Sequence, residues 1–126
     1  QAALDAAIQY SKERVVFGRP IGQNQGIRFM LAEMEMKVEA ARQLMLYACQ
    51  LIDEGKPIGH HGSIAKTFAS EAAVSVTNDA LQIFGGYGYS REYPIEKMVR
   101  DARIYTIFEG ANQIQRDIIG KTIIGK

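Results

Sequence analysis

Residues 82–110 read QIFGGYGYSREYPIEKMVRDARIYTIFEG, and the breaks within this stretch decide the fold predicted for the whole chain. A helix that arrives from upstream ends at Gly85-Gly86, and the stretch closes on Phe108-Glu109-Gly110. Between these breaks Pro94 marks the start of a short helix that fades around Ile104, because proline is favoured at the first helical position. The stretch therefore offers bare backbone at one end and a lone carboxylate at the other. That arrangement suits ligand binding and proton transfer.

Outside this stretch, apolar residues recur at helical spacing in further segments. We expect helices over 1–17, over 25–53 and from about His61 or Ser63 to Phe84, and a last one that begins after Gly110. The longest helix carries a heptad-like seam suited to near-parallel neighbours, made of Ile27, Leu31, Met34, Val38, Ala41, Met45, Ala48 and Ile52. No segment shows the period-two alternation of a strand. The prediction is an all-α fold, an antiparallel four-helix up-and-down bundle with one additional short helix.

Length and composition indicate one globular domain that has a core of its own. The chain has 126 residues, of which 47% are hydrophobic, and 15 basic residues nearly balance 14 acidic ones. This balance favours neither a nucleic-acid partner nor a membrane surface, and no apolar run approaches the roughly 20 residues of a bilayer span. Because the chain begins with Gln1 rather than Met, we expect it to be part of a longer protein.

Cysteine and histidine usage gives no sign of a metal site. The single Cys49 cannot form an internal disulfide, which fits a reducing compartment, and we expect it to be a small buried residue. His60 and His61 are adjacent, so they point apart on a helix, and neither has a partner at Glu-x-x-His or His-x-x-x-His spacing. The sequence therefore predicts no metal ligand set.

Gly85, Gly86 and Gly88 admit two interpretations. They follow a helix and not a strand, so they do not form the dinucleotide-binding turn of a Rossmann fold. One interpretation is a helix C-cap, since glycine adopts positive φ without penalty. A cap needs only one glycine, however, and two adjacent ones with Gln82 a turn earlier let a phosphate or another backbone come close. Both interpretations stay open on the pattern alone.

Two charged residues have similarly open roles. Glu109 sits among apolar neighbours, and a carboxylate in such surroundings holds a proton more tightly, as a general base near neutrality requires. It could equally be an acid at the N-terminus of the last helix, where the helix dipole favours negative charge. Arg14 could bind a phosphate or serve as a cation near a helix C-terminus.

Several short motifs occur together in an order typical of one family. They are Glu13-Arg14-Val15-Val16-Phe17-Gly18, Phe29-Met30-Leu31-Ala32-Glu33-Met34, Gln82-Ile83-Phe84-Gly85-Gly86-Tyr87-Gly88, Glu92-Tyr93-Pro94, Arg100-Asp101-Ala102-Arg103-Ile104 and Phe108-Glu109-Gly110-Ala111-Asn112-Gln113-Ile114-Gln115-Arg116. Each motif is weak by itself, but in this order and spacing they are specific. Over residues 1–126 the chain resembles the C-terminal helical domain of the acyl-CoA dehydrogenases, in the short- and medium-chain arrangement.

The resemblance implies a role for the carboxylate. Glu109 matches the base that removes the α-proton of an acyl-CoA thioester, while the β-hydrogen leaves as hydride to FAD to give a trans-2-enoyl-CoA. Gly110 matches a substrate-contacting position. The thioester carbonyl needs a hydrogen bond as charge develops on it, and in this family the backbone N–H of the base supplies one. The electron-transfer flavoprotein is the acceptor that the family implies.

The resemblance also implies a cofactor site. Positions that match residues along the FAD dinucleotide are Arg14, Gln25, Gln82, Ile83, Phe84, Gly85, Gly86, Ala111, Asn112 and Gln113. In this family two subunits contact one FAD, which implies a homodimer or homotetramer. Position 111 is Ala where the family commonly has a hydroxyl residue, and losing one hydrogen bond costs about 1 kcal/mol.

The family's N-terminal helical domain and central β domain have no counterpart in these 126 residues. We expect about 250 further residues upstream for two such domains. Two alternatives stay open beside the dehydrogenase: a relative that acts as an acyl-CoA oxidase, and a helical folding or oligomerisation module without catalysis of its own. Bacterial cytoplasm and mitochondrial matrix are equally compatible with the sequence, and acyl chain length is not specified by it.

Overall fold

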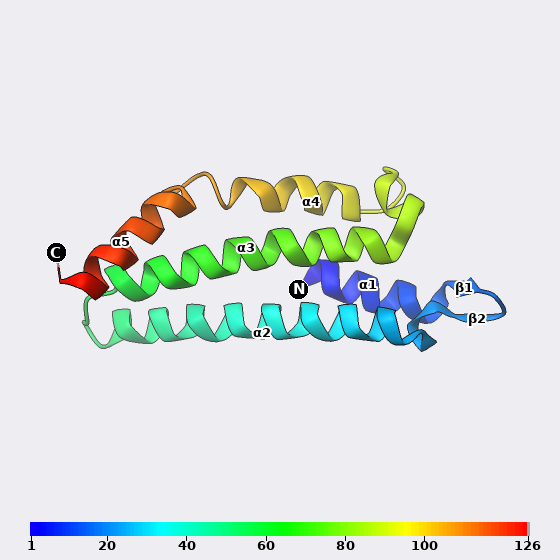
Figure 1. The fold of residues 1–126 in the computed structure, drawn as a ribbon, viewed down its shortest axis with the longest axis horizontal. Coiled ribbons are helices and arrows are strands. Elements are labelled where there is room, and N and C mark those ends of the chain that lie inside the picture. The colour runs from blue at the N-terminus through cyan, green and yellow to red at the C-terminus, as the bar shows by residue number, and fades with distance from the viewer. Residues whose placement is uncertain (126) are drawn as a thin grey trace.

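Five α-helices account for most of residues 1–125, which are the residues that the computed structural model describes (Figure 1). In chain order the elements are α1 (Ala2–Glu13), β1 (Val15–Val16), β2 (Arg19–Pro20), the 3-10 helix η1 (Ile21–Gln23), α2 (Gln25–Asp53), α3 (Gly59–Phe84), the 3-10 helix η2 (Gly85–Tyr89), α4 (Ile95–Ile104) and α5 (Asn112–Ile124). Helices α1 to α4 alternate in direction, and α5 packs against α3 as the additional helix (Figure 1). The all-α prediction is confirmed. Lys126, the last residue of the predicted domain, lies outside the described residues.

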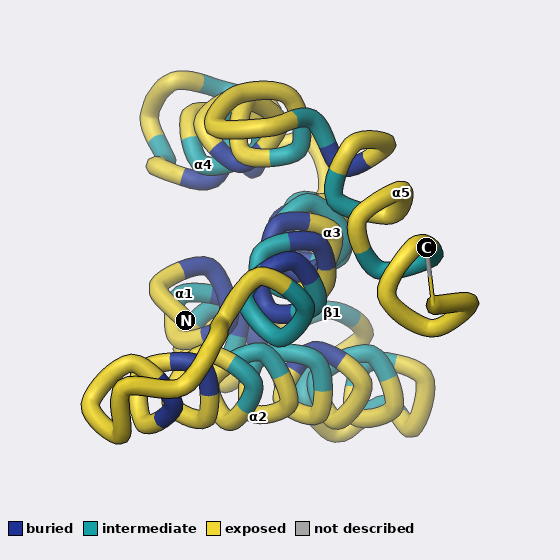
Figure 2. Tube along the Cα trace, turned by 90° about the vertical axis from the view of Figure 1, so that its left-hand side faces the viewer, coloured by how far each residue is buried: buried dark blue, intermediate teal, exposed yellow. Residues whose placement is uncertain are grey.

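Helix α3 is the centre of the bundle, with α1, α2, α4 and α5 around it (Figure 2). The largest fully buried side chains are Leu4, Met34 and Ile95, one each from α1, α2 and α4. They form one core cluster with Val76 and Ile83 of α3. Because every other helix packs on α3, the residues of this helix determine where each neighbour lies.

The predicted seam of α2 is only partly buried. Met34 and Ala48 are buried, whereas Met45 and Ile52 remain 48% and 56% exposed. The reason is the length of the neighbour: α1 has 12 residues and α2 has 29, so α1 covers only the first half of α2 (Figure 1). A seam pattern identifies the apolar face, but it does not say how far along that face a partner extends.

The prediction of a helix up to Phe17 was wrong at its end. Helix α1 ends at Glu13, and Val15–Val16 pairs with Arg19–Pro20 in a short antiparallel hairpin. Phe17 and Gly18 form its turn, with φ of 51° and 78°, as two-residue hairpin turns require. Each strand has only two residues, too few to show an alternating pattern.

The glycines after α3 have different roles. Gly85 adopts a φ of 61° directly after the last helical residue, so it is the C-cap that one interpretation predicted. A Cβ at Gly86 would meet nothing within 4 Å, which leaves its backbone open to an approaching group. A Cβ at Gly88 would lie 2.6 Å from Cβ of Phe84, so this glycine is required by packing.

Gly88→Ala is therefore expected to lower the free energy of unfolding by about 1–3 kcal/mol, the usual cost of overpacking. Gly86→Ala is the matched control, since its added methyl group meets open space and its φ is not positive. Urea denaturation of both variants measures the difference. Equal stability of the two variants would contradict the close contact at Gly88.

Candidate functional site

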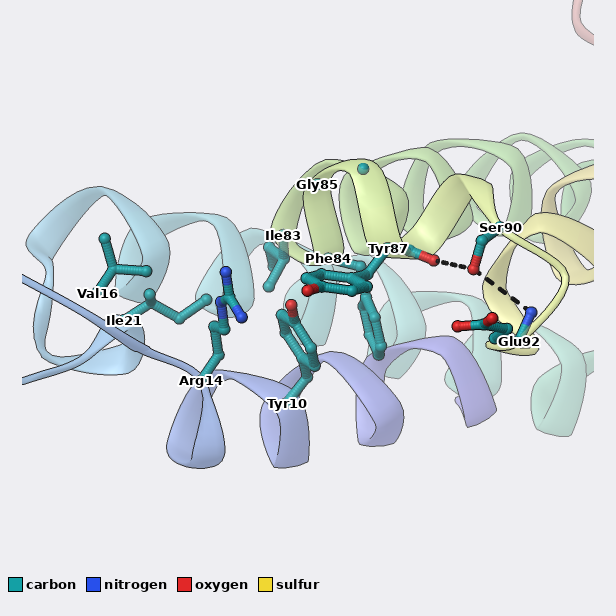
Figure 3. A pocket seen from close by; sticks show the side chains of 11 residues that line it. Tyr10, Arg14, Val16, Ile21, Ile83, Phe84, Gly85, Tyr87, Ser90 and Glu92 are labelled. Atoms are coloured by element: carbon teal, nitrogen blue, oxygen red, sulfur yellow. Dashed lines mark hydrogen bonds between the residues drawn. The ribbon is translucent and has the colours of Figure 1, made fainter.

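A cavity of about 580 Å³ lies where the end of α3 meets the end of α1 and the hairpin (Figure 3). The guanidinium carbon of Arg14 lies 5.1 Å from the ring centroid of Tyr87, a distance suited to a cation–π contact. Within residues 1–125, no side-chain hydrogen bond or ion pair engages this guanidinium. Arg14 thus offers hydrogen-bond donors and a positive charge at the cavity.

The wall of this cavity is an aromatic cluster. Ile83 and Phe84, two predicted cofactor residues, are buried, and Phe84 stacks on Tyr10 with ring centroids 4.1 Å apart. Tyr93 meets both rings edge to face. Burial raises the pKa of Tyr10, so its hydroxyl stays neutral. The side chains of Ile83 and Phe84 therefore form part of the cavity wall that α3 contributes (Figure 3).

The glycine pair separates this cavity from a second one. Gly85 and Gly86 line both the cavity with Arg14 and a neighbouring one of about 630 Å³, which Gln82 and Asp79 also line. Gln25 starts α2 and is exposed, and it is not among the lining residues of either cavity. The structure thus brings Arg14 together with residues 83–86, places Gln82 at the neighbouring cavity, and leaves Gln25 outside the lining of both.

Glu109 lies in a different place, on the loop between α4 and α5 (Figure 1). It is exposed, and it shares a cavity of about 430 Å³ with Ala69, Ala73, Tyr105 and Phe108. Its φ of 53° is unusual for a residue with a side chain, and the following Gly110 has a φ of 87°. A Cβ at Gly110 would clash with the side-chain amide of Gln115, so the sharp bend after Glu109 requires glycine.

Helix α3 holds this loop by hydrogen bonds. The Lys66 ammonium donates to the Gly110 carbonyl oxygen and to Oδ1 of Asn112, both at 2.7 Å. Asn112 is only 2% exposed and donates from Nδ2 to Oγ of Ser70 at 2.9 Å. Its backbone N–H closes the loop by donating to the carbonyl oxygen of Thr106 at 3.1 Å. The Asn112 side chain, predicted to contact cofactor, is occupied by internal partners.

Sequence reasoning missed Lys66 and Ser70. Both lie on the predicted third helix, four residues apart and hence on one face, within an alanine-rich stripe. No local pattern in the sequence indicated that this lysine has acceptors on the loop before the last helix. Ala111 is the N-cap of α5 and has no polar side-chain atom. Gln113 is exposed in the first turn of α5, and its side chain forms no hydrogen bond within residues 1–125.

Glu71 extends this network towards α5. A hydrogen bond from Arg116, the largest cause, and one from Asn112 lower the pKa of Glu71 below its ordinary value of 4.5. A carboxylate whose pKa is lower in the folded state stabilises the fold fully at pH values above its unfolded-state pKa. This stabilisation is lost as the pH falls through the folded-state pKa. The side chains are about half exposed, at 53% and 48%, so solvent screens the pair.

Glu71→Gln is expected to destabilise the fold by about 0.2–1 kcal/mol at pH 7, and by less at pH 3.5. Urea denaturation of both proteins at the two pH values measures this difference. A destabilisation that is the same at both values would show that the charge of Glu71 contributes nothing.

The two groups of predicted site residues lie far apart along α3. Ala69 and Ala73 line the cavity of Glu109, whereas Phe84 lines that of Arg14. At 1.5 Å per residue, these positions are separated by about 16–22 Å along the helix axis. Arg14 and Glu109 are therefore not parts of one small pocket within a single chain.

None of the helices in residues 1–125 combines the length and apolar character that crossing a bilayer requires. Nor do three His, Cys, Asp or Glu side chains gather anywhere in this range in a way that could hold a metal ion. Cys49, predicted to be buried, is exposed, because it lies on the outer side of α2.

Comparisons with known proteins agree with the motif pattern. The chain is 52% identical over 125 residues to an acyl-CoA dehydrogenase of Bacillus subtilis, with 99% of this chain and 33% of the relative covered. The structure of butyryl-CoA dehydrogenase from Megasphaera elsdenii matches with a TM-score of 0.96 and 49% identity, over 98% of this chain and 32% of that one. A chain in a structure of the electron transferring flavoprotein of Acidaminococcus fermentans matches with a TM-score of 0.97 and 48% identity, over 98% of this chain and 33% of that one.

The chain thus spans about a third of the length of the relatives that it matches. The family described as the acyl-CoA dehydrogenase C-terminal domain matches residues 1–124, nearly the whole sequence. The helical bundle, the glycine break after α3 and the Glu109 loop all fall within this match. The chain belongs to the acyl-CoA dehydrogenase C-terminal domain family.

Proposed function

We propose that this chain supplies the base and part of the cofactor site of an FAD-dependent acyl-CoA dehydrogenase. The observation that carries the proposal is the position of Glu109, which is exposed on a sharp bend and lines a largely apolar cavity of about 430 Å³. An acyl chain is apolar and its α-proton is weakly acidic. A base at an apolar wall, fixed by the backbone, suits such a substrate.

In the proposed reaction the Glu109 carboxylate takes the α-proton of the acyl-CoA thioester, and the β-hydrogen leaves with its electron pair. Within residues 1–125, the backbone N–H of Glu109 donates to no protein acceptor. It is therefore available to the thioester carbonyl oxygen, where negative charge develops as the proton leaves. Gly110 has no side chain that could obstruct the thioester. Bound FAD would supply the hydride acceptor.

The residues at the other end of α3 fit an FAD dinucleotide. Arg14 offers an unpaired guanidinium for the diphosphate, and the open backbone at Gly86 leaves room for a phosphate to approach. Gln82 lines the adjoining cavity, Ile83 and Phe84 line the cavity of Arg14, and Gly85 lines both. Predicted contacts from Gln25, Ala111, Asn112 and Gln113 remain part of the proposal, with the Asn112 side chain the least available of them.

The distance between the two groups supports a role for two subunits. The cavities of Arg14 and Glu109 are separated by about 16–22 Å along α3. This separation is accommodated more easily if two subunits share two FAD molecules than if one subunit binds a single FAD alone. Exposed apolar residues on α5, such as Ile114 and Ile123, fit such an assembly. We therefore propose a homodimer or homotetramer.

The partners in this proposal are an acyl-CoA substrate and an electron-transfer flavoprotein, in a reducing compartment that suits the free Cys49. The same fold would serve an acyl-CoA oxidase. Oxygen consumption by the substrate-reduced complete protein distinguishes these two activities, because only the oxidase passes its electrons to oxygen rapidly.

The test uses the complete protein, loaded with FAD and mixed without oxygen with butyryl-CoA. Bleaching of the visible flavin band supports the proposal, and a band that persists with several acyl-CoA lengths contradicts it. The bare chain is examined in parallel by adding FAD and desalting. We expect the bare chain to be inactive, because it spans a third of its relatives' length.

A further inference from the structure

Lys66 is a charged residue on α3, the central helix of the bundle. It lies in the second turn of α3 and is partly buried. Within residues 1–125 its ammonium forms no ion pair with a carboxylate. Its acceptors are instead the carbonyl oxygen of Gly110 and Oδ1 of Asn112, residues 44 and 46 positions away in the sequence.

The loop that Lys66 contacts needs such an anchor. Glu109 and Gly110 both have positive φ, and a residue with a side chain in that region costs of order 1 kcal/mol or more. The carbonyl that Lys66 holds belongs to the residue directly after Glu109. The only other side chain that reaches this carbonyl within residues 1–125 is Gln115, at 3.4 Å. A shift of the Gly110 peptide would rotate the Glu109 backbone and so re-aim its carboxylate and N–H.

Lys66 is itself held in place. Its second acceptor, Asn112, is buried and bonded to Ser70, which stands one turn further along α3. Lys66, Ser70 and Glu109 line the same cavity. One rigid helix therefore fixes the ammonium and one wall of the proposed acyl pocket together.

We propose that Lys66 is a positioning residue for the proposed base: its bond to the Gly110 carbonyl holds the Glu109 bend in the orientation that proton removal needs. This inference rests on the proposed function. A displacement of about 1 Å at a reacting group can cost up to a hundredfold in rate. Because Asn112 and Gln115 also restrain the loop, we expect about a tenth of that loss from Lys66 alone.

The experiment replaces Lys66 in the complete, FAD-loaded protein. Lys66→Met removes the donors and keeps most of the side-chain length, and Lys66→Arg restores donors and charge. Lys97→Met is the matched control, since it removes an exposed ammonium of α4 that pairs with Asp101. Single-turnover flavin reduction by butyryl-CoA is measured per bound flavin, together with the substrate concentration that gives half the maximal rate.

Lys66→Met is expected to slow flavin reduction about tenfold with little change in the half-saturating concentration, and Lys66→Arg to recover most of the rate. A reduction rate within threefold of that of the unchanged protein overturns the inference. So does a change confined to a higher half-saturating substrate concentration. If Lys66→Met does not bind FAD, the Lys66→Gln variant is judged by the same two criteria, since its amide keeps a hydrogen-bond donor without the charge.

If Glu109→Gln leaves reduction intact, the proposed function itself fails. If Glu109→Gln abolishes reduction and Lys66→Met does not affect it, only the role of Lys66 is wrong.

Discussion

Glu109→Gln in the complete, FAD-loaded protein is expected to slow flavin reduction by acyl-CoA about a thousandfold. The substitution keeps the size and the hydrogen-bonding ability of the side chain but removes the group that accepts the α-proton. General-base catalysis typically contributes between a hundredfold and ten-thousandfold, and among residues 1–125 no second carboxylate lines the cavity of Glu109. The measurement is anaerobic stopped-flow absorbance of the flavin band.

The control for this prediction is Glu39→Gln. Glu39 is an exposed carboxylate on α2 that pairs with Arg42, remote from both cavities. Both variants are expected to retain FAD and to unfold at the same temperature as the parent, because neither side chain belongs to the core. Reduction by Glu109→Gln at a rate near that of the parent would remove Glu109 from the role of base.

Arg14→Met is expected to weaken FAD binding by about tenfold to a hundredfold. Hydrogen bonds to charged groups contribute about 1.5–3 kcal/mol, and each 1.4 kcal/mol corresponds to a factor of ten. The guanidinium stands over the Tyr87 ring and has no carboxylate partner within residues 1–125, so its replacement removes no ion pair from the described part of the chain. The loss should therefore appear chiefly in cofactor affinity, because the fold itself loses only a cation–π contact, about 0.5–1 kcal/mol.

FAD titration of the complete apoprotein, followed by flavin fluorescence, measures the dissociation constant. Arg100→Met is the matched control, since Arg100 pairs with Glu96 on the exposed side of α4 and lines neither cavity of the glycine pair. A further measurement is the dependence of FAD affinity on ionic strength. The affinity of the parent protein should fall more steeply with ionic strength than that of the Arg14→Met variant. An unchanged dissociation constant would place the cofactor diphosphate elsewhere.

The helices were predictable because their signals are local. The bounds of α2 and the end of α3 at Phe84 agree with the prediction, since apolar spacing and glycine breaks act over a few residues. The exception is the region after Glu13. There the hairpin depends on two residues per strand and on a turn with positive φ at Phe17, a residue that rarely adopts it.

The candidate site was predictable in part. Ordered motifs identified Glu109, Arg14 and the glycine pair through resemblance, and the structure places each of them at a cavity. They gave no indication of Lys66 or of the inward turn of Asn112. Those features depend on a hydrogen bond between residues 44 positions apart, and no local pattern encodes such a pairing.

By itself, then, the sequence determined the class of fold, the places where helices end and the family, because periodicity, breaks and motif order are properties of the chain read in one dimension. Only the tertiary structure decided that Arg14 and Glu109 lie at separate cavities, that α1 covers half of α2, and that α3 anchors the Glu109 loop. These depend on how helices pack around α3, and packing is decided by side chains that are distant in sequence and adjacent in space.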